Sequence, residues 1–522
     1  MKFIQGQDRS QTHLFPVSID QAIDSSSEVR LIDLFVDSMA LENFGFDKQF
    51  VENGRPAYHP SDLLKLYIYG YMNKVRSSRD LEKECKRNIE VMWLLKCLQP
   101  DHNTISNFRR DNPKAIKKVF RETVRIAKHF NLIGGKLVAG DSSKFRAQNS
   151  KKNNFNKKKI ERHVAYIDNK LDEYNRLLAE LDGDNKEKID KEIDKHNRRK
   201  DNYKNIENQL DESGHVQVST SDPDSRQMII RNNITEVAYN VQTTVDAKHC
   251  LPIDYLVTNT NDSKAMGGML RRAKSILNTN KFTALYDKGY HTGSELDAAD
   301  RLNIETIVAI PGIPRSSQAP DPAYNVEHFK YSQKEHTYTC PEGYTLRTNG
   351  TWHKGRNYRF QQFKTNHCKT CPARPKCTKS VQNGKIIQRS EYIPAIEKNR
   401  KRVENNMDYY RRRQAIVEHP YGTIKRQWGF SYISTKKGKN KASADVGFMF
   451  IAYNLRRIFN ILEKETLKNY LKTIDFNFMR ILYQIWLHFV TFNELYFQHQ
   501  KNIIPLNIPS NLLIFNQNLI KR

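Results

Sequence analysis

The stretch KLVAGD, residues 136–141, decides how the rest of the chain is interpreted. Its apolar run is short enough to be a β-strand, and that strand ends in the carboxylate of Asp141. In open sheets with helices on both faces, ligands bind in a crevice at the carboxyl ends of the strands. Asp141 is therefore expected at the ligand-binding edge of a sheet.

Further strands and a helix follow this stretch. Residues 237–245 alternate with the period of a strand, and IDYLVTN (253–259), FTALYD (282–287) and IETIVAIP (304–311) are also typical of strands. The stretch SKAMGGMLRRAKSIL (263–277) has the apolar spacing of a helix. This order predicts a mixed α/β sheet with flanking helices, in which Asp287 ends a second strand.

Asp141 and Asp287 are the first candidates for chemistry, because both end strands and their side chains could meet. Neighbouring carboxylates repel each other unless a cation neutralises them, and Mg²⁺ or Mn²⁺ prefers oxygen ligands. A third carboxylate would complete a site for two metal ions and phosphodiester chemistry. Glu418 is the best candidate, since it lies in the arginine-rich stretch YYRRRQAIVEHPYGTIKRQWG (409–429). Taken singly, each aspartate could instead be a loop residue or a helix cap, and Glu418 a solvated helix residue.

Three other acids, Asp222, Asp224 and Asp246, compete for these roles, and we rank them second. Asp246 follows a well-formed strand. The strand order nevertheless places it at the turn into the next strand, away from the crevice where Asp141 is expected.

The first 130 residues form the expected amino-terminal domain, which has a helical pattern from about residue 32 to residue 112. Its segment PDHNTISNFRRDNP (100–113) predicts a short helix that carries Arg109 and Arg110. These arginines could contact DNA. A helical bundle whose arginines are only solvated explains the same pattern.

A helical hairpin is predicted at about residues 155–212, inside the sheet domain. Apolar residues recur there with heptad spacing, followed by the turn sequence DGDN (182–185) and a second, weaker run. The residues of the first run are Ile160, Val164, Ile167, Leu171, Tyr174, Leu178 and Leu181. The pattern does not identify a partner for the hairpin.

The chain has 522 residues, enough for several packed units, and a formal charge of +28 from 86 basic and 58 acidic residues. This excess favours a polyanionic partner, although a ribosome-associated protein or simply a basic surface fits it too. The first residues, MKFIQGQDRSQTHLF, lack the apolar core of a signal peptide, so a cytoplasmic protein is expected. Polar residues interrupt the apolar stretch Phe476–Phe497, which favours a packing helix and no membrane partner.

Four cysteines, Cys340, Cys368, Cys371 and Cys377, fall within an interruption of the sheet domain at about residues 311–390. They resemble a zinc ribbon, in which four thiolates bind structural zinc, and His367 could replace one of them. Reduced structural thiols remain the alternative, because the spacing of the last pair is loose. A disulfide is not expected in the cytoplasm.

Several motifs together carry a resemblance to a known family. The motifs are VAGDSSKFRAQNSKKNNFNKKK (138–159), STSDPDSRQM (219–228), YNVQTTVDAKH (239–249), VTNTNDS (257–263), YDKGYHTG (286–293), the cysteine cluster and VEHPYGTIKRQWG (417–429). From about Tyr58 to Phe459 the chain resembles bacterial DDE transposases of the insertion-sequence 4 superfamily, most closely the insertion-sequence 1182 family.

The resemblance implies an RNase H-like catalytic core with Asp141 on its first strand, Asp287 after its fourth and Glu418 on a later helix. It also implies a signature of tyrosine, arginine, glutamate and lysine, which Tyr410, Arg413 and Lys425 match in kind. The arginine is out of register. The superfamily spacing puts it where Gln414 stands, and one residue turns a helix by about 100°. Pro420 predicts a kink or helix boundary near Glu418.

The function implied is transposition of DNA. The enzyme would cleave at the terminal inverted repeats and use the released 3′ hydroxyl to attack target DNA, with two Mg²⁺ or Mn²⁺ ions. The expected catalytic domain covers residues 131–465, and residues 466–522 form a helical tail of unknown role. The resemblance further implies a dimer or larger assembly on double-stranded DNA in the bacterial nucleoid. A metal-dependent nuclease without strand transfer, and an inactive DNA-binding relic, are the alternatives.

Overall fold

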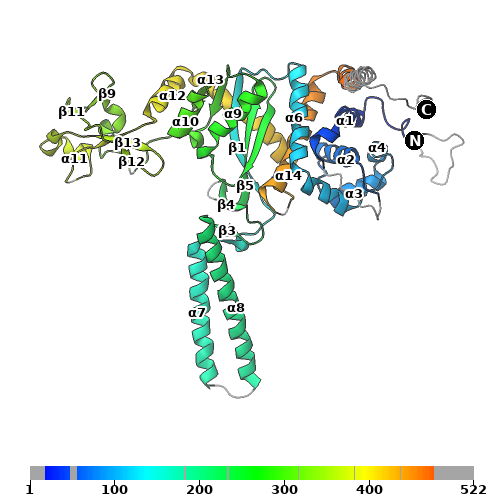
Figure 1. The fold of residues 1–522 in the computed structure, drawn as a ribbon, viewed down its shortest axis with the longest axis horizontal. Helices are drawn as coiled ribbons and strands as arrows, with labels where there is room; N and C mark the ends of the chain where they lie inside the picture. The colour runs from blue at the N-terminus through cyan, green and yellow to red at the C-terminus, as the bar shows by residue number, and fades with distance from the viewer. Residues whose placement is uncertain are drawn as a thin grey trace, which may run out of the picture.

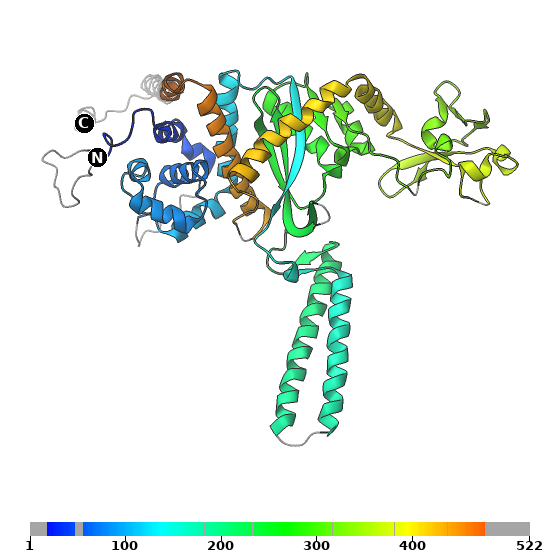
Figure 2. The same cartoon turned by 180° about the vertical axis from the view of Figure 1, so that it is seen from behind.

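The structure is a computed structural model that describes residues 18–46, 56–180, 184–231, 234–315, 317–380, 382–435 and 437–474. A mixed sheet lies at the centre of the molecule. Amino-terminal helices lie at one end, a small β-rich lobe lies at the other, and a helical hairpin projects from the middle (Figure 1, Figure 2).

Six strands form the central sheet. They are β1 (Leu137–Arg146), β4 (Arg226–Arg231), β5 (Ile234–Asp246), β6 (Leu251–Thr258), β7 (Thr283–Tyr286) and β8 (Glu305–Val308). Strand β5 is antiparallel to β1, β4 and β6, whereas β7 is parallel to β1 and β8 is parallel to β7. The prediction of a mixed α/β sheet is therefore confirmed.

Helices cover both faces of this sheet. The helices near it are α6 (Pro113–His129), α9 (Met266–Leu277), α10 (Gly293–Arg301), α12 (Ile393–Asn405), α13 (Met407–Tyr421) and α14 (Lys439–Ile461). On one face, Ile416 and Val417 of α13 pack against Leu137 and its neighbours in β1 and β7. The glycine of KLVAGD, Gly140, lies against the ring of Tyr286 in β7, where a side chain would clash. Close packing of β1 and β7 therefore needs glycine at this position.

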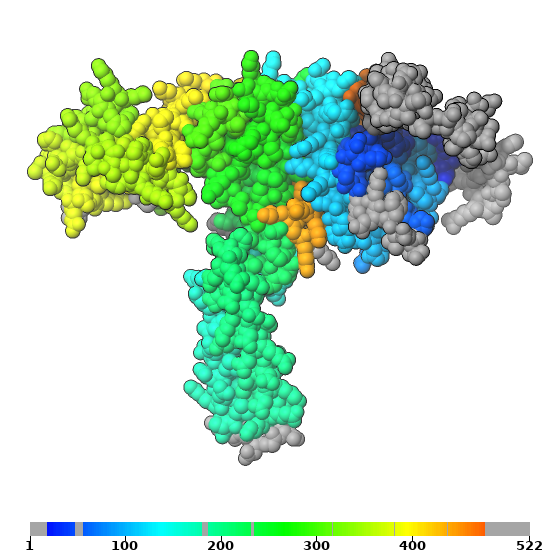
Figure 3. Space-filling model, in the orientation of Figure 1, coloured from blue at the N-terminus to red at the C-terminus, as the bar shows by residue number. Residues whose placement is uncertain are grey.

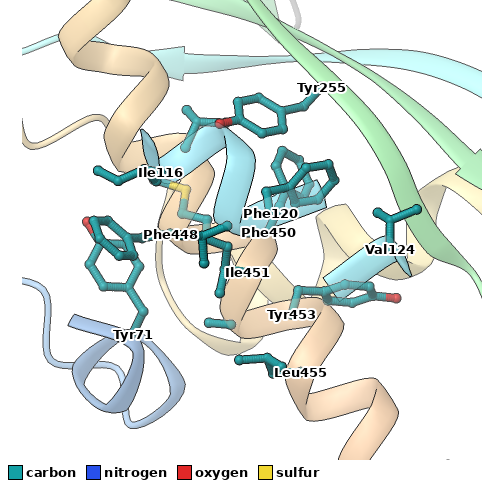
Figure 4. Packing of buried hydrophobic residues seen from close by; sticks show 14 of the residues in the cluster. Tyr71, Ile116, Phe120, Val124, Tyr255, Phe448, Phe450, Ile451, Tyr453 and Leu455 are labelled. Atoms are coloured by element: carbon teal, nitrogen blue, oxygen red, sulfur yellow. The ribbon is translucent and has the colours of Figure 1, made fainter. Parts of the chain in front are cut away.

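Helix α14 joins the amino-terminal helices to the sheet. Those helices are α1 (Glu28–Asp37), α2 (Pro60–Met72), α3 (Ser78–Arg87), α4 (Ile89–Leu94) and α5 (His102–Asp111). Phe448 of α14 stacks on Tyr67 of α2 at 4.7 Å between ring centroids. Phe450 contacts Tyr255 of β6 at 5.5 Å and Phe120 of α6 at 6.3 Å (Figure 4). One hydrophobic cluster consequently runs from the amino-terminal helices to the sheet.

A buried ion cluster reinforces this junction. Asp445 of α14 is fully buried and pairs with Arg76 at 2.9 Å and with Arg109 at 3.6 Å. Tyr71 and the backbone N–H of Ser434 also donate hydrogen bonds to its carboxylate. Burial acts to raise the pKa of Asp445, but the two arginines outweigh it and the pKa is lowered.

The projecting hairpin consists of α7 (Lys157–Glu180) and α8 (Asp184–Ser213), which run side by side away from the sheet (Figure 1, Figure 3). Phe155, Ile160 and Leu210 form a small buried cluster at its base. Of the predicted heptad residues, Ile160 and Ile167 are buried, whereas Leu181 lies outside the described residues. The hairpin therefore has its own apolar seam.

The β-rich lobe contains two three-stranded sheets. Its elements are β9 (Lys330–Ser332), β10 (Thr337–Thr339), β11 (Thr345–Leu346), β12 (His353–Lys354), β13 (Arg359–Phe363), α11 (Arg374–Cys377) and β14 (Ile387–Ser390). Within the described residues, no helix is long and apolar enough to cross a membrane. The expected packing helix at Phe476–Phe497 lies outside the described residues.

Candidate active site

The two aspartates come from adjacent parallel strands. Asp287 follows the end of β7 as expected, but β1 continues past Asp141 to Arg146, so Asp141 lies within its strand, just beyond the part of β1 that pairs with β7. Ala139 of β1 lies opposite Leu285 of β7, and Asp141 and Asp287 each follow two residues later. Side chains two residues apart in a strand point to the same face, so Asp141 shares the α13 face of β1 with Ala139. The pKa of Asp141 is raised to about 6, chiefly by burial, and the negative charges of Asp287 and Asp262 contribute to this shift. The structure thus brings Asp141 and Asp287 into electrostatic contact.

Asp287 begins the short helix η4 (Lys288–Tyr290), and its carboxylate accepts a hydrogen bond from the N–H of Gly289 at 2.9 Å. Gly289 lies between two carboxylates. A Cβ at this position would lie 3.0 Å from Oδ1 of Asp287 and 3.5 Å from Oδ2 of Asp262. This glycine therefore allows the two acids to approach each other.

Asp262 is a third acid at this site, and our sequence interpretation missed it. It lies in η3 (Asp262–Lys264), between β6 and α9, and accepts hydrogen bonds from Asn240 at 2.8 Å and Gln242 at 2.6 Å. Burial acts to raise the pKa of Asp262, but Lys144 and the hydrogen bonds outweigh it, so the pKa is lowered. The available signal was an acid three residues after the end of IDYLVTN, within the motif VTNTNDS.

Helix α13 places an arginine over the aspartates. Nη1 of Arg413 lies 3.6 Å from Oδ2 of Asp141, and Arg413 acts to lower the pKa of that carboxyl. Tyr410, one turn earlier, is half-buried, and burial raises its pKa. Arg413 acts against that shift, whereas Asp287 adds to it. Tyr410 and Arg413 therefore belong to the same site as the two aspartates.

Glu418 lies on another side of α13. Its side chain is exposed and accepts a hydrogen bond from Gln414 at 2.9 Å. Because Glu418 follows Arg413 by five residues, the two are separated by about 140° around the helix. The acids that contribute to the raised pKa of Asp141 are Asp287 and Asp262, whereas the described partner of Glu418 is Gln414. The assignment of Glu418 as the third acid remains a prediction.

Lys425 follows a change in helix type. Pro420 lies in the last turn of α13, which ends at Tyr421 and continues as a π-helix, η8 (Gly422–Gln427). The expected helix boundary near Glu418 thus falls just after the proline, which has no N–H to continue the hydrogen-bond pattern. The ammonium of Lys425 donates to Ser143 Oγ and to the carbonyl of Lys144, both at 2.9 Å. Burial lowers the pKa of Lys425 to about 8, and Lys144 contributes to that shift.

The two arginines predicted to bind DNA have different environments. Arg109 is 5% exposed, and its guanidinium donates to Tyr71 and pairs with Asp445. This burial corrects the expectation that Arg109 contacts DNA, because its charge is used to join α5 to α14. Arg110 is half-exposed and pairs with Asp111.

The competing acids have structural partners. Asp246 accepts hydrogen bonds from the backbone N–H groups of Gly134, Gly135 and Lys248, each at 2.9 Å, and so holds the turn before β1. Asp222 accepts hydrogen bonds from Tyr239 and from the N–H of Gly438, and Asp224 accepts one from the N–H of Lys439. The main acidic contributors to the raised pKa of Asp141 are instead Asp287 and Asp262.

The four clustered cysteines line one small cavity of about 20 Å³ in the β-rich lobe, together with Lys385. Burial raises the pKa of the Cys377 thiol, Lys385 acts against this shift, and Cys368, Cys340 and Cys371 add to it. Gly384 packs so closely on Cys368 that a side chain there would clash. His367 instead stacks on Tyr344, at 5.0 Å between ring centroids.

Neither site is a complete metal centre as it stands. Across the described ranges, no group of three or more histidine, cysteine, aspartate or glutamate side chains is placed to hold a metal ion. The chemistry of the donors still differs between the two sites. The site beside β1 and β7 offers the carboxylate oxygens of Asp141 and Asp287, which suit Mg²⁺ or Mn²⁺, and the lobe offers thiolates, which suit zinc.

Comparisons with known proteins agree with the class that this site suggests. A family model described as "Transposase domain (DUF772)" matches residues 17–111, and one described as "Transposase DDE domain" matches residues 339–459. No curated protein matches the chain. Together the two family matches support a DNA transposase of the DDE type.

One solved structure is also similar, the "Cryo-EM structure of piggyBac transposase synaptic complex with hairpin DNA". The identity is 10%, the match covers 93% of this chain and 84% of that chain, and the TM-score is 0.27. At this score the likeness carries no argument about the fold.

Proposed function

We propose that the protein cleaves DNA at the ends of an insertion sequence and joins the released 3′ hydroxyl to target DNA. The observation that carries this proposal is the proximity of Asp141 and Asp287, which each follow the last β1–β7 pair by two residues, with the pKa of Asp141 raised to about 6. An RNase H-like core, with β1 as its first strand and β7 as its fourth, would present the two acids in this way.

The carboxylates of Asp141 and Asp287 would hold the divalent ions, with Glu418 as the third ligand that the resemblance implies. Bound Mg²⁺ or Mn²⁺ would activate the attacking oxygen and stabilise the leaving oxygen. The raised pKa of Asp141 fits this use, because a cation relieves the repulsion among neighbouring carboxylates. Asp262 is the other oxygen donor within reach of the pair, and it is already held by Asn240 and Gln242.

The basic and aromatic residues would position DNA around these acids. Arg413 lies beside Asp141, and Lys425 lies against β1 two residues beyond it, so both could bind the phosphates that flank the reacting bond. Tyr410 would complete this group. Arg110 is left as the candidate in α5 for contact with the terminal repeats.

Other features of the proposal rest on the resemblance. The protein would act as a dimer or larger assembly that pairs two transposon ends in the bacterial nucleoid. Zinc bound by Cys340, Cys368, Cys371 and Cys377 would stabilise the β-rich lobe, which has only a small core of its own.

The direct test uses purified protein and labelled duplexes that carry the DNA from either side of the gene. We expect cleavage with Mg²⁺ that is lost in Asp141→Asn, Asp287→Asn and Glu418→Gln, while all three variants still bind the duplex. Full cleavage by any one of them would remove that residue from the site. Gln414→Ala is the matched control for Glu418→Gln, because it removes only the hydrogen bond to Glu418.

A second assay separates the enzyme alternatives. A duplex with a pre-cleaved 3′ end is supplied with a target plasmid, and joined products are counted. A transposase joins the two, whereas a nuclease cuts and never joins. Binding without either reaction would indicate an inactive relic.

A further inference from the structure

A basic groove of about 630 Å³ lies at the amino end of β1, separate from the carboxylate site. Lys136, Lys248 and Arg412 line it, together with Tyr409 and Asp246. The three cations come from the start of β1, the turn after β5, and α13. Segments far apart in the sequence therefore place positive charge around one hollow.

The three cations are exposed, and no acidic side chain of the described residues forms an ion pair with any of them. The ammonium of Lys248 donates a hydrogen bond to the carbonyl of Asn131. Asp246 is the one acid of the groove, but it is fully buried and its carboxylate is occupied by three backbone N–H groups. The groove consequently presents a net positive charge to solvent.

The sequence of α13 explains why this groove and the carboxylate site are neighbours. It contains two tyrosine–arginine pairs with the same spacing, and the second pair is displaced by one residue along the helix. Tyr410 and Arg413 face the aspartates, whereas Tyr409 and Arg412 line the groove, with the guanidinium of Arg412 at 5.3 Å from the Tyr409 ring centre. A shift of one residue turns a helix by about 100°, so the two pairs lie on adjacent faces.

The basic surface continues beyond this groove. Lys136 also lines a second hollow, of about 420 Å³, together with Lys281 and the first residues of β7. Glu305 lies in that hollow, where it accepts a hydrogen bond from Thr283. Two lysines, Lys136 and Lys281, therefore lie near the amino ends of β1 and β7.

We propose that this groove binds the phosphate backbone of double-stranded DNA, as a contact distinct from the carboxylate site. The inference rests on the proposed function, because it assumes that the substrate is DNA. Exposed lysine and arginine side chains without acidic partners suit a polyanion, and an arginine held against an aromatic ring suits a phosphate oxygen.

The distance between the two sites fits a single duplex. Four residues of β1 separate Leu137, in the groove, from Asp141, which corresponds to roughly 13 Å of extended strand. Each DNA strand carries a phosphate about every 3.4 Å along the axis. A duplex that lies along β1 would therefore contact the groove about four nucleotides from the reacting bond. A separate target duplex is the other source of the same phosphate chemistry.

The test compares two triple variants with equal net charge. The groove variant is Lys136→Gln with Lys248→Gln and Arg412→Gln. The control variant is Lys83→Gln with Arg301→Gln and Arg411→Gln, three exposed cations that form ion pairs within their own helices and lie outside the groove. Duplex binding is measured from 50 to 200 mM salt, with terminal-repeat DNA and with random duplex.

We expect the groove variant to lower the slope of log affinity against log salt by about 2.7, and the control variant by less than about 1. If the slope falls only with terminal-repeat DNA, the groove binds the transposon end. If the slope falls with both duplexes, the groove binds any DNA backbone, including that of the target. If the slope of log affinity against log salt is the same for the groove variant and the control variant, the groove proposal is wrong.

Footprinting then places the contact. Hydroxyl-radical protection should disappear in the groove variant about four nucleotides from the cleavage position and persist at that position. The outcome is independent of catalysis. A wild-type protein that binds DNA and does not cut it contradicts the proposed function alone, whereas a cutting protein with unchanged groove-variant binding contradicts the groove alone.

Discussion

Arg413 lies 3.6 Å from Asp141, although the spacing typical of the resembled superfamily would put Gln414 in the arginine's position. The helix geometry explains the difference. Val417 packs against the sheet, so the residue one turn before it, Arg413, also faces the sheet, whereas Gln414 faces Glu418. The arginine that serves the site is thus selected by the buried face of α13.

Removing Arg413 should change the pH at which the site ionises. Arg413 favours the charged form of Asp141, so Arg413→Gln should raise the pKa of Asp141 above its present value of about 6. The acid limb of the cleavage rate against pH should then move to higher pH. Arg411→Gln is the control, because Arg411 pairs with the exposed Asp408. An unmoved acid limb would contradict the proximity of Arg413 and Asp141.

Asp141→Asn should stabilise the metal-free protein at neutral pH. A carboxyl whose pKa rises from 3.8 to about 6 on folding favours the folded state below pH 3.8, and this contribution is lost as the pH rises through 6. At pH 8 the variant should gain free energy of unfolding on the order of 2 kcal/mol, and near pH 4 it should gain little. Urea denaturation at both pH values measures this. Added Mg²⁺ should stabilise only the wild type.

Gly289→Ala should impair cleavage without unfolding the protein. The new Cβ would lie 3.0 Å from Oδ1 of Asp287, so that carboxylate must shift. We expect a loss of roughly tenfold or more in cleavage rate, as for a small misplacement of a reacting group. Gly268→Ala is the control, since its nearest neighbour is Nη1 of Arg272 at 3.8 Å. Equal rates for the two variants would show that Asp287 tolerates the shift.

The β-rich lobe should bind one zinc ion per chain. Metal analysis of purified protein should find it, and Cys371→Ser should abolish it, because thiolates are the ligands. Cys97→Ser is the control, as Cys97 lies outside the cluster. Chelation should expose the lobe to proteolysis. Zinc-free protein with an unchanged protease pattern would leave the four cysteines as reduced structural thiols.

Asp445→Asn should strongly destabilise the whole described body. The change leaves Arg76 and Arg109 buried without a counter-charge, a loss of about 3–5 kcal/mol in the free energy of unfolding. Thermal or urea unfolding measures it. Asp408→Asn, at an exposed ion pair, should change stability by less than about 1 kcal/mol. A similarly small effect at Asp445 would mean that water solvates the arginines.

Sequence reasoning placed Asp141 and Asp287 correctly on neighbouring strands, because apolar runs and their order define a sheet. It ended the first strand too early, at Asp141, because the polar residues after Asp141 continue β1 by pairing with β5. It failed at Asp262, whose role depends on Asn240 and Gln242 in another strand. It also failed at Arg109, since its counter-charge, Asp445, comes from a distant helix. Burial of a charged residue is decided by such long-range partners, and local spacing does not report them.

Helix α14 has a mechanical consequence, because it shares one core with both the amino-terminal helices and the sheet. A domain on a flexible tether could present a bound repeat to the carboxylates at many offsets. Here a repeat held by the amino-terminal helices would sit at one fixed offset from Asp141. The distance from the repeat to the cleavage position would then be fixed. It would depend on the packing of Phe448 against Tyr67 of α2 and of Phe450 against Tyr255 of β6.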